Sequence, residues 1–207
     1  MLLIRIKICG ITSLEDALAC VNYGADAVGF VFAKSPRKTD KHKCREIVRR
    51  LPPFITAVGL FANQSMQEIN DITEFCPLDV LQFHGDESNE FCEGFNKRII
   101  KAFRISNSDD LKDLDKYNVS AYLLDSFNRS KLGGTGESFD WKLIENVKNR
   151  RLILAGGLNP DNAGEAVRKY LPYGVDVSSG VESSPGVKDH KKIKAFIEAV
   201  RRFSSNI

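Results

Sequence analysis

The sequence predicts an α/β protein with a single domain, residues 1–207, in which eight strand–helix units close into a (β/α)8 barrel, the TIM barrel. Short runs rich in Val, Ile, Leu and Phe recur along the whole chain, and an amphipathic stretch follows each run. Runs such as residues 27–32 are apolar at nearly every position, which is typical of parallel strands covered by helices. Glycine-rich turns follow the late runs. An open, doubly wound sheet is the rival architecture, but it usually carries such a turn after its first strand.

The predicted strands and helices alternate in eight units. The strands are expected at residues 3–9, 27–32, 55–61, 80–84, 99–104, 121–125, 152–155 and 174–178. The helices are expected at residues 14–22, 41–51, 66–75, 89–95, 109–117, 141–148, 161–170 and 190–203. Capping residues support several ends. Ser13 with Asp16 starts the first helix and Gly24 ends it, while Asn159 and Pro160 start the seventh.

Composition and charge exclude several classes of protein. With 43% hydrophobic and 28% charged residues, the 207-residue chain has the make-up of a globular domain. Its net charge of +3 is mild, and the basic stretch 188–202 is expected to be the solvated face of a helix, so we predict no nucleic-acid partner. No apolar run approaches the ~20 residues of a membrane span, and no signal-peptide pattern is present. We therefore expect no membrane association and a cytoplasmic location.

The cysteines are predicted to be free thiols in a reducing compartment. Their number is odd, and no Cys-x-x-Cys pair or neighbouring histidine spacing occurs among Cys9, Cys20, Cys44, Cys76 and Cys92. A disulfide framework and a zinc site are therefore both disfavoured. We therefore expect no zinc bound by these thiols.

Reactive side chains stand at the carboxyl ends of the predicted strands, where barrel enzymes carry their chemistry. Cys9, His84 and Asp125 end the first, fourth and sixth strands, and Arg37 follows the second. A thiol paired with a carboxyl group can transfer protons, since an apolar mouth favours the acid and nearby cations favour the thiolate. Cys9 could instead be inert packing. His84 could contact substrate or only backbone, and Arg37 could bind a carboxylate or lie on the surface.

Glycine-rich turns after the last two strands suggest a phosphate site. Gly156 and Gly157 follow the seventh strand, and Ser179 and Gly180 follow the eighth. Barrel enzymes commonly bind phosphate there on backbone N–H groups, and glycine allows the close approach. The sequence therefore predicts a small phosphorylated molecule as the substrate.

Lys7 and Asp176 are expected to meet inside the barrel. Lys7 lies two residues before Cys9, so both share one face of the first strand. In a closed barrel the eighth strand neighbours the first, and Asp176 could neutralise Lys7. A structural ion pair is our preferred interpretation for Lys7.

Several motifs together resemble the phosphoribosylanthranilate isomerase family, nearly from end to end. In the first half they are KICGIT from Lys7, GFVFAKSPR from Gly29 and LQFHG from Leu81. In the second half they are LLDS from Leu123, GGTGESFDW from Gly133, LAGGLNPDN from Leu154 and VDVSSGVESSPGVKD from Val175. The number, order and spacing of these motifs carry the resemblance.

The resemblance implies an Amadori rearrangement in tryptophan biosynthesis that uses neither metal nor coenzyme. It implies that Asp125 is the general acid and Cys9 the general base, and that Arg37 binds the anthranilate carboxylate. It also implies that His84 and Asp176 contact the substrate, and that the glycine-rich turns hold the phosphate. The loop with Gly133 and Gly136, in the irregular stretch 126–139, would close over the site.

Two alternatives to this function stay open. One is a different phosphosugar isomerase or epimerase barrel, although such enzymes usually place carboxylates or metal-binding histidines where this chain has Cys9. The other is a phosphosugar-binding module without catalysis, because fold alone does not fix function. The sequence leaves the oligomeric state open between a monomer and a homodimer.

Overall fold

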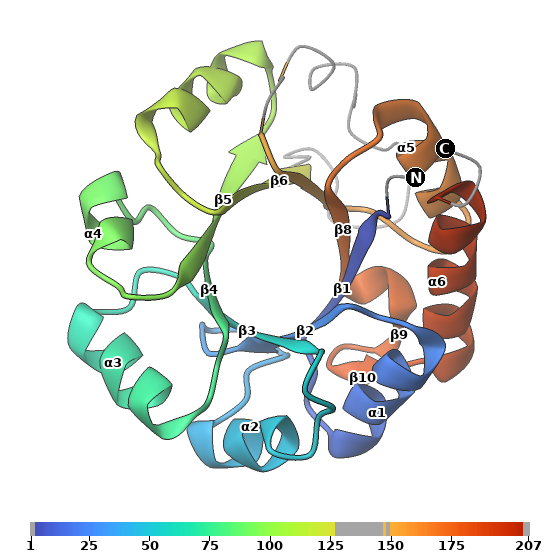
Figure 1. The fold of residues 1–207 in the computed structure, drawn as a ribbon, viewed down its shortest axis with the longest axis horizontal. Coiled ribbons are helices and arrows are strands. Elements are labelled where there is room, and N and C mark those ends of the chain that lie inside the picture. Colours follow the sequence, from blue (N-terminus) through green and yellow to red (C-terminus); the bar gives the residue numbers. More distant parts are fainter. Residues whose placement is uncertain (1–2, 127–146, 148–149, 205–207) are drawn as a thin grey trace.

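The computed structural model describes residues 3–126, 147 and 150–204, and these residues form a closed barrel of eight parallel strands (Figure 1). The strands are β1 (Arg5–Cys9), β2 (Ala27–Val31), β3 (Thr56–Phe61), β4 (Val80–Phe83), β5 (Arg98–Ile105), β6 (Ala121–Ser126), β7 (Leu152–Ala155) and β8 (Gly174–Val177). Because β1 pairs with both β2 and β8, the sheet has no free edge. The predicted barrel is confirmed, and the open sheet is wrong.

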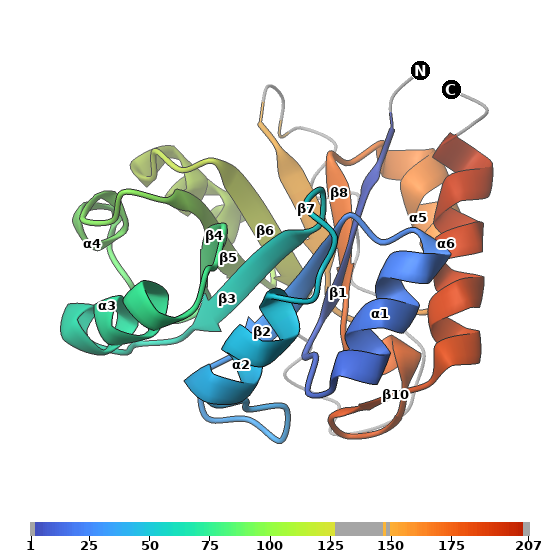
Figure 2. The same ribbon diagram turned by 60° about the horizontal axis from the view of Figure 1, so that its bottom comes forward.

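Helices surround the barrel and lie against its outer face (Figures 1 and 2). They are α1 (Leu14–Tyr23), α2 (Lys41–Val48), α3 (Met66–Phe75), α4 (Asn89–Glu93), α5 (Ala163–Tyr170) and α6 (His190–Ser204). α6 packs against both α1 and α5 and so covers the seam between the first and last strands. None of the helices in the described ranges is long and apolar enough to cross a membrane.

The segment after β5 differs from the sequence prediction. Residues 109–117 were expected to be an α-helix, and the chain instead forms a 3-10 helix, η1 (Ser108–Lys116). Asn107 and Asp110 form a capping box at its start, and aspartate, a poor helix former, fills several of its positions. The ion pairs along η1 join residues three apart, the spacing at which side chains eclipse in a 3-10 helix.

The helix caps agree with the sequence prediction at α1 and differ from it at α5. Ser13 Oγ accepts from the N–H of Asp16, and Gly24 ends α1 in the left-handed conformation at φ 100°. α5 begins at Ala163, two residues later than expected, because the Asn159 side chain caps a preceding turn. The predicted helix at 141–148 and the predicted lid at 126–139 lie almost wholly outside the described residues.

Two apolar layers hold the fold together. The larger layer lies between strands and helices, and it includes Phe30, Phe61, Phe83 and Phe196. A smaller cluster fills the barrel interior. Its members are Val58, Val80, Ile100, Ala102, Ala121, Leu123, Ile153 and Ala155. Because strand residues alternate between these layers, the next inward residues toward the carboxyl ends form the floor of the mouth.

A short hairpin between β8 and α6 was not expected from the sequence. The chain leaves β8 through a 3-10 turn, η3 (Ser179–Val181), and then forms the antiparallel strands β9 (Glu182–Ser184) and β10 (Val187–Lys188). This hairpin lies beside α1 at the carboxyl end of the barrel (Figure 2). It supplies two charged residues to the candidate site.

Candidate active site

A cavity of about 320 Å³ opens at the carboxyl ends of the strands. Most of the residues predicted for the site line it: Cys9, Arg37, His84, Asp125, Gly156, Gly157, Asp176 and Ser179. Gly180 is not among the lining residues and packs against the backbone of Leu158. The structure therefore brings residues from six different strand ends to one opening.

Cys9 lies at the floor of this cavity and is buried, with 5% of its surface exposed. Burial raises the pKa of its thiol above the ordinary value, and the nearby ammonium of Lys7 opposes that rise. Lys7 Nζ lies 2.9 Å from Asp176 Oδ2, so the expected ion pair between β1 and β8 is present. Although burial alone would lower the pKa of Lys7, Asp176 and Cys9 outweigh it and raise that pKa.

Asp125 and His84 contact each other across β5. His84 Nε2 lies 3.1 Å from Asp125 Oδ2, and His84 Nδ1 lies 3.2 Å from the side-chain nitrogen of Gln82. Because an amide NH₂ only donates, this arrangement leaves Nδ1 as the acceptor and puts the ring proton on Nε2, where it points to Asp125. His84 thus orients the carboxyl group, and the side chain of Asp125 stays about one-third exposed to the cavity.

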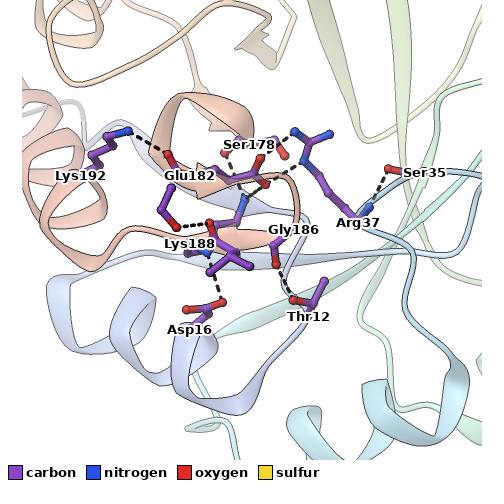
Figure 3. A network of polar contacts seen from close by, with 11 residues as sticks. Thr12, Asp16, Ser35, Arg37, Ser178, Glu182, Gly186, Lys188 and Lys192 are labelled. Atoms are coloured by element: carbon purple, nitrogen blue, oxygen red, sulfur yellow. Dashed lines mark hydrogen bonds and ion pairs between the residues drawn. The ribbon is translucent and has the colours of Figure 1, made fainter.

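Arg37 is held by an acid that the sequence analysis did not single out. Its Nε and Nη2 donate to Glu182 Oε1 and Oε2 at 2.8 and 2.7 Å, a bidentate pair. Lys188, fully buried, donates to Glu182 Oε1 at 2.9 Å (Figure 3). Two cations thus share one carboxylate, and the cluster keeps a net positive charge. Arg37 also lines the cavity, and Glu182 takes only two of its five N–H donors.

Replacing Glu182 with glutamine should remove a pH-dependent part of stability. Burial alone would raise the pKa of Glu182, but the hydrogen bonds from Arg37 and Lys188 outweigh it and hold that pKa below the ordinary value. A carboxylate with a lowered pKa stabilises the fold above its unfolded pKa of about 4.3, and this contribution is lost as the pH falls through the lowered value. We expect Glu182→Gln to cost about 3 kcal/mol at neutral pH and much less in acid, measured by urea unfolding.

The control for that variant is Glu198→Gln on α6. Glu198 pairs with Lys194 at 3.8 Å, and both side chains are more than half exposed. Such surface pairs contribute about 0–1 kcal/mol. Equal losses for the two variants at neutral pH, or a Glu182→Gln loss that does not shrink in acid, would contradict the account of Glu182.

The glycine-rich turns have the backbone shape of an anion site. Gly156 and Gly157 have φ values of 78° and 67°, a region that side chains other than glycine rarely adopt. A Cβ atom on Gly180 would lie only 1.9 Å from the carbonyl oxygen of Leu158. Glycine at 180 is therefore required for the turns after β7 and β8 to touch. Because glycine has no side chain, a ligand can approach the backbone N–H groups of these turns closely.

A second cavity, about 570 Å³, opens at the opposite end of the barrel, among the first residues of the strands. None of the predicted site residues lines it, so its larger volume does not mark the site of the chemistry. In the parts of the chain that the structure describes, no three His, Cys, Asp or Glu side chains are grouped so that they could hold a metal ion.

The residues that the sequence analysis missed fall into two kinds. Gln82 and Arg104 lie on the inward face of β4 and β5 and line the mouth, so strand alternation could have identified them. Glu182 and Lys188 carry no such signal, because they reach the site through the unexpected hairpin. Glu182 contacts Arg37, which lies 145 residues away in the sequence.

Comparisons with known proteins agree on one family. The family model described as N-(5'-phosphoribosyl)anthranilate isomerase matches residues 6–199. A Pseudomonas aeruginosa protein named N-(5'-phosphoribosyl)anthranilate isomerase is 52% identical over 201 residues, covering 96% of this chain and 95% of that protein. A Pelobacter propionicus protein of the same name is 48% identical over 205 residues, covering 98% of each chain.

Solved structures give the same result. Phosphoribosyl anthranilate isomerase from Thermotoga maritima matches with a TM-score of 0.89 and 43% identity, over 96% of this chain and 99% of that one. An isomerase structure in complex with reduced 1-(o-carboxyphenylamino)-1-deoxyribulose 5-phosphate matches at 0.86 and 42%, with the same coverage. 3-Hexulose-6-phosphate synthase from Salmonella typhimurium, at 10% identity and a TM-score of 0.71, shares the fold alone. Family model, relatives and structures together show that this chain belongs to the N-(5'-phosphoribosyl)anthranilate isomerase family.

Proposed function

We propose that this chain converts N-(5-phosphoribosyl)anthranilate into 1-(2-carboxyphenylamino)-1-deoxyribulose 5-phosphate, with Asp125 as general acid and Cys9 as general base. The observation that carries the proposal is that both side chains line one cavity whose rim includes a glycine-rich turn with positive φ. An acid, a base and an anion seat are the groups that this rearrangement needs.

The first chemical step is opening of the ribose ring. Asp125 gives its proton to the ring oxygen, the C1–O bond breaks, and the anilino nitrogen forms a cationic C–N double bond. His84 supports this step because its Nε2–H is held 3.1 Å from Asp125 Oδ2 and fixes the carboxyl group in the cavity. The partly exposed side chain of Asp125 leaves its other oxygen open to the substrate.

The second step is removal of the C2 proton by Cys9. The adjacent cationic imine makes this C–H acidic, so a thiolate is a sufficient base. Loss of the proton gives an enolamine, and tautomerisation gives the ketone. Asp176 supports this step at the neighbouring position, because its Oδ1 is buried without a hydrogen-bond partner in the described ranges and can accept from a sugar hydroxyl.

Binding of the substrate uses the two ends of the cavity. Backbone N–H groups of Gly156, Gly157, Ser179 and Gly180 would hold the phosphate. Arg37 would bind the anthranilate carboxylate through the N–H groups that Glu182 leaves free. The net positive charge of the cluster of Arg37, Glu182 and Lys188 favours this second anion.

The experiment that tests the function follows the fluorescence of phosphoribosylanthranilate after addition of purified protein without metal. We expect the fluorescence to decay much faster than the spontaneous background. A rate equal to the background would contradict the isomerase function and favour the binding module or the epimerase. Binding of a reduced product analogue, measured by calorimetry on the same sample, shows that the protein tested is folded and has its cavity formed.

Partners and location complete the proposal. We propose that the partner is a small phosphorylated molecule and that the protein works as a monomer or a homodimer. A Thermotoga maritima relative is described as dimeric, with monomers generated from it. We propose that the protein works in the cytoplasm, because all five cysteines are free and buried, which is typical of a reducing compartment.

A further inference from the structure

Lys7 is a buried cation inside the barrel, and the proposed mechanism assigns no role to it. Lys7 and Cys9 lie two residues apart on β1, so both side chains point to the barrel interior. The strand register places Lys7 beside Asp176 of β8 and Cys9 beside Gly29 of β2. The charged side chain therefore lies one inward position deeper than the thiol.

Gly29 leaves the space that Lys7 and Cys9 share. A Cβ atom at Gly29 would lie 2.9 Å from Cys9 Sγ and 3.1 Å from Lys7 Cε. Both distances are shorter than ordinary van der Waals contact, so any side chain at this position would displace the thiol or the lysine stem. Cys9 Sγ and Lys7 Cε thus border the same small volume, and Cε carries the ammonium nitrogen, so the positive charge of Lys7 lies close to the thiol.

Stability alone is a weak reason for an ion pair at this depth. Lys7 is 5% exposed and Asp176 is 7% exposed, so both groups have lost their water. Well-packed apolar side chains often stabilise a fold as much as a buried pair of this kind does. Asp176 uses only one oxygen on Lys7, which leaves the ammonium with further N–H donors.

We propose that Lys7 is a positioning residue for the isomerisation: its ammonium, anchored by Asp176 beside the volume that it shares with Cys9 Sγ, stabilises by its positive charge the thiolate that takes the substrate proton. This inference rests on the function proposed above, in which Cys9 is the base. The C2 proton goes to Sγ, the C–H electron pair becomes the C1–C2 double bond, and the imine nitrogen takes up the electrons of its double bond to C1. Lys7 keeps its own proton throughout.

The charged groups around Cys9 come from every element packed against it. They are Lys7 on β1, Asp176 on β8, Lys188 on β10 and Arg37 after β2, with Lys34, His84, Arg104 and Asp125 lining the same cavity. Burial raises the pKa of the Cys9 thiol, and Lys7 is the strongest of the charges that oppose it. Asp176 acts in the same direction as burial. Loss of Lys7 therefore favours the neutral thiol.

The test measures how the alkylation of Cys9 by iodoacetamide depends on pH, resolved by mass spectrometry. For Lys7→Gln we expect the midpoint to move up by about one pH unit, a roughly tenfold loss of thiolate at neutral pH. The acid limb of the kcat profile should move by the same amount, with KM little changed. Lys7→Arg keeps a cation and should restore most of the wild-type midpoint.

The matched control is Lys101→Gln on β5. Lys101 pairs with Glu87 at 3.0 Å and is as buried as Lys7, but it faces away from the barrel interior and from Cys9. A general effect of losing a buried ion pair would appear in both variants, whereas the proposed role shifts the midpoint only in Lys7→Gln. An unchanged midpoint and an unchanged pH profile in folded Lys7→Gln would overturn the inference.

A second variant covers the case in which Lys7→Gln does not fold. Gly29→Ala keeps every charge and inserts a methyl group between the thiol and the lysine stem, so its alkylation midpoint should also rise. An unchanged midpoint in folded Gly29→Ala would count against the inference. Cys9→Ser separates this inference from the function itself. Near-normal turnover in Cys9→Ser would contradict the role of Cys9 as the base. An inactive Cys9→Ser together with an unshifted alkylation midpoint in Lys7→Gln would overturn the role of Lys7 alone.

Discussion

Cys9→Ser is expected to lower kcat by about 10²-fold or more while the protein stays folded. A serine hydroxyl is far less acidic than a thiol, so almost no alkoxide is available to remove the C2 proton. The fold should persist because serine is of similar size and Cys9 lies at the cavity floor, where 5% of its surface is exposed. Steady-state kinetics and thermal unfolding of the same preparation check the two statements.

The control for this variant is Cys20→Ser on α1. Cys20 is completely buried in the layer between helices and barrel, and it does not line the cavity. Its replacement costs stability through the buried hydroxyl but should leave kcat close to that of the wild type. Near-normal turnover in Cys9→Ser would remove the proposed base.

Asp125→Asn is the second change with a large expected effect, again about 10²-fold or more in kcat. The amide keeps the size of the carboxyl group and can still accept a hydrogen bond from His84, but it has no acidic proton to give to the ring oxygen. Asp26→Asn is the control, because Asp26 is a partly buried carboxylate at the opposite end of the barrel that pairs with Arg5 and Arg201. We expect Asp26→Asn to lower the free energy of unfolding without lowering kcat comparably.

Deuterium at C2 of the substrate distinguishes the two roles. In Asp125→Asn, ring opening limits the rate and the C2–H bond is intact in that step, so the isotope effect should be close to unity. In Cys9→Ser, proton removal limits the rate and the isotope effect should be large. The reverse pattern would contradict the assignment of acid and base.

The sequence predicted the parts of the site that follow from strand periodicity. Cys9, His84 and Asp125 each end an apolar run, and an eight-stranded barrel brings all strand ends to one mouth. Gln82 follows the same rule and could have been added. The 3-10 helix Ser108–Lys116 was misjudged because its polar pattern fits both helix types, and aspartate-rich capping decides between them.

The partners of Arg37 could not be predicted from local sequence. The bidentate contact with Glu182 exists only because the hairpin of β9 and β10 folds back over the rim. The two strands of this hairpin are so short and polar that their sequence resembles that of an irregular loop. Residue type predicted only that the guanidinium binds an anion. What holds the guanidinium, and in which orientation, is decided by tertiary contacts.

That hairpin has a consequence for how the chain becomes active. Thr12 donates to the carbonyl oxygen of Gly186 at 2.6 Å, and the hairpin also meets Asp16 and Arg37, so it joins the chain's earliest units to its latest. Contacts this distant in sequence form late, since a long segment must be ordered first. A nascent or partly folded chain with its first and last units apart would lack the contacts that hold Arg37, the residue proposed to bind the substrate carboxylate. We therefore expect turnover only from the completely folded chain and none from partly folded intermediates.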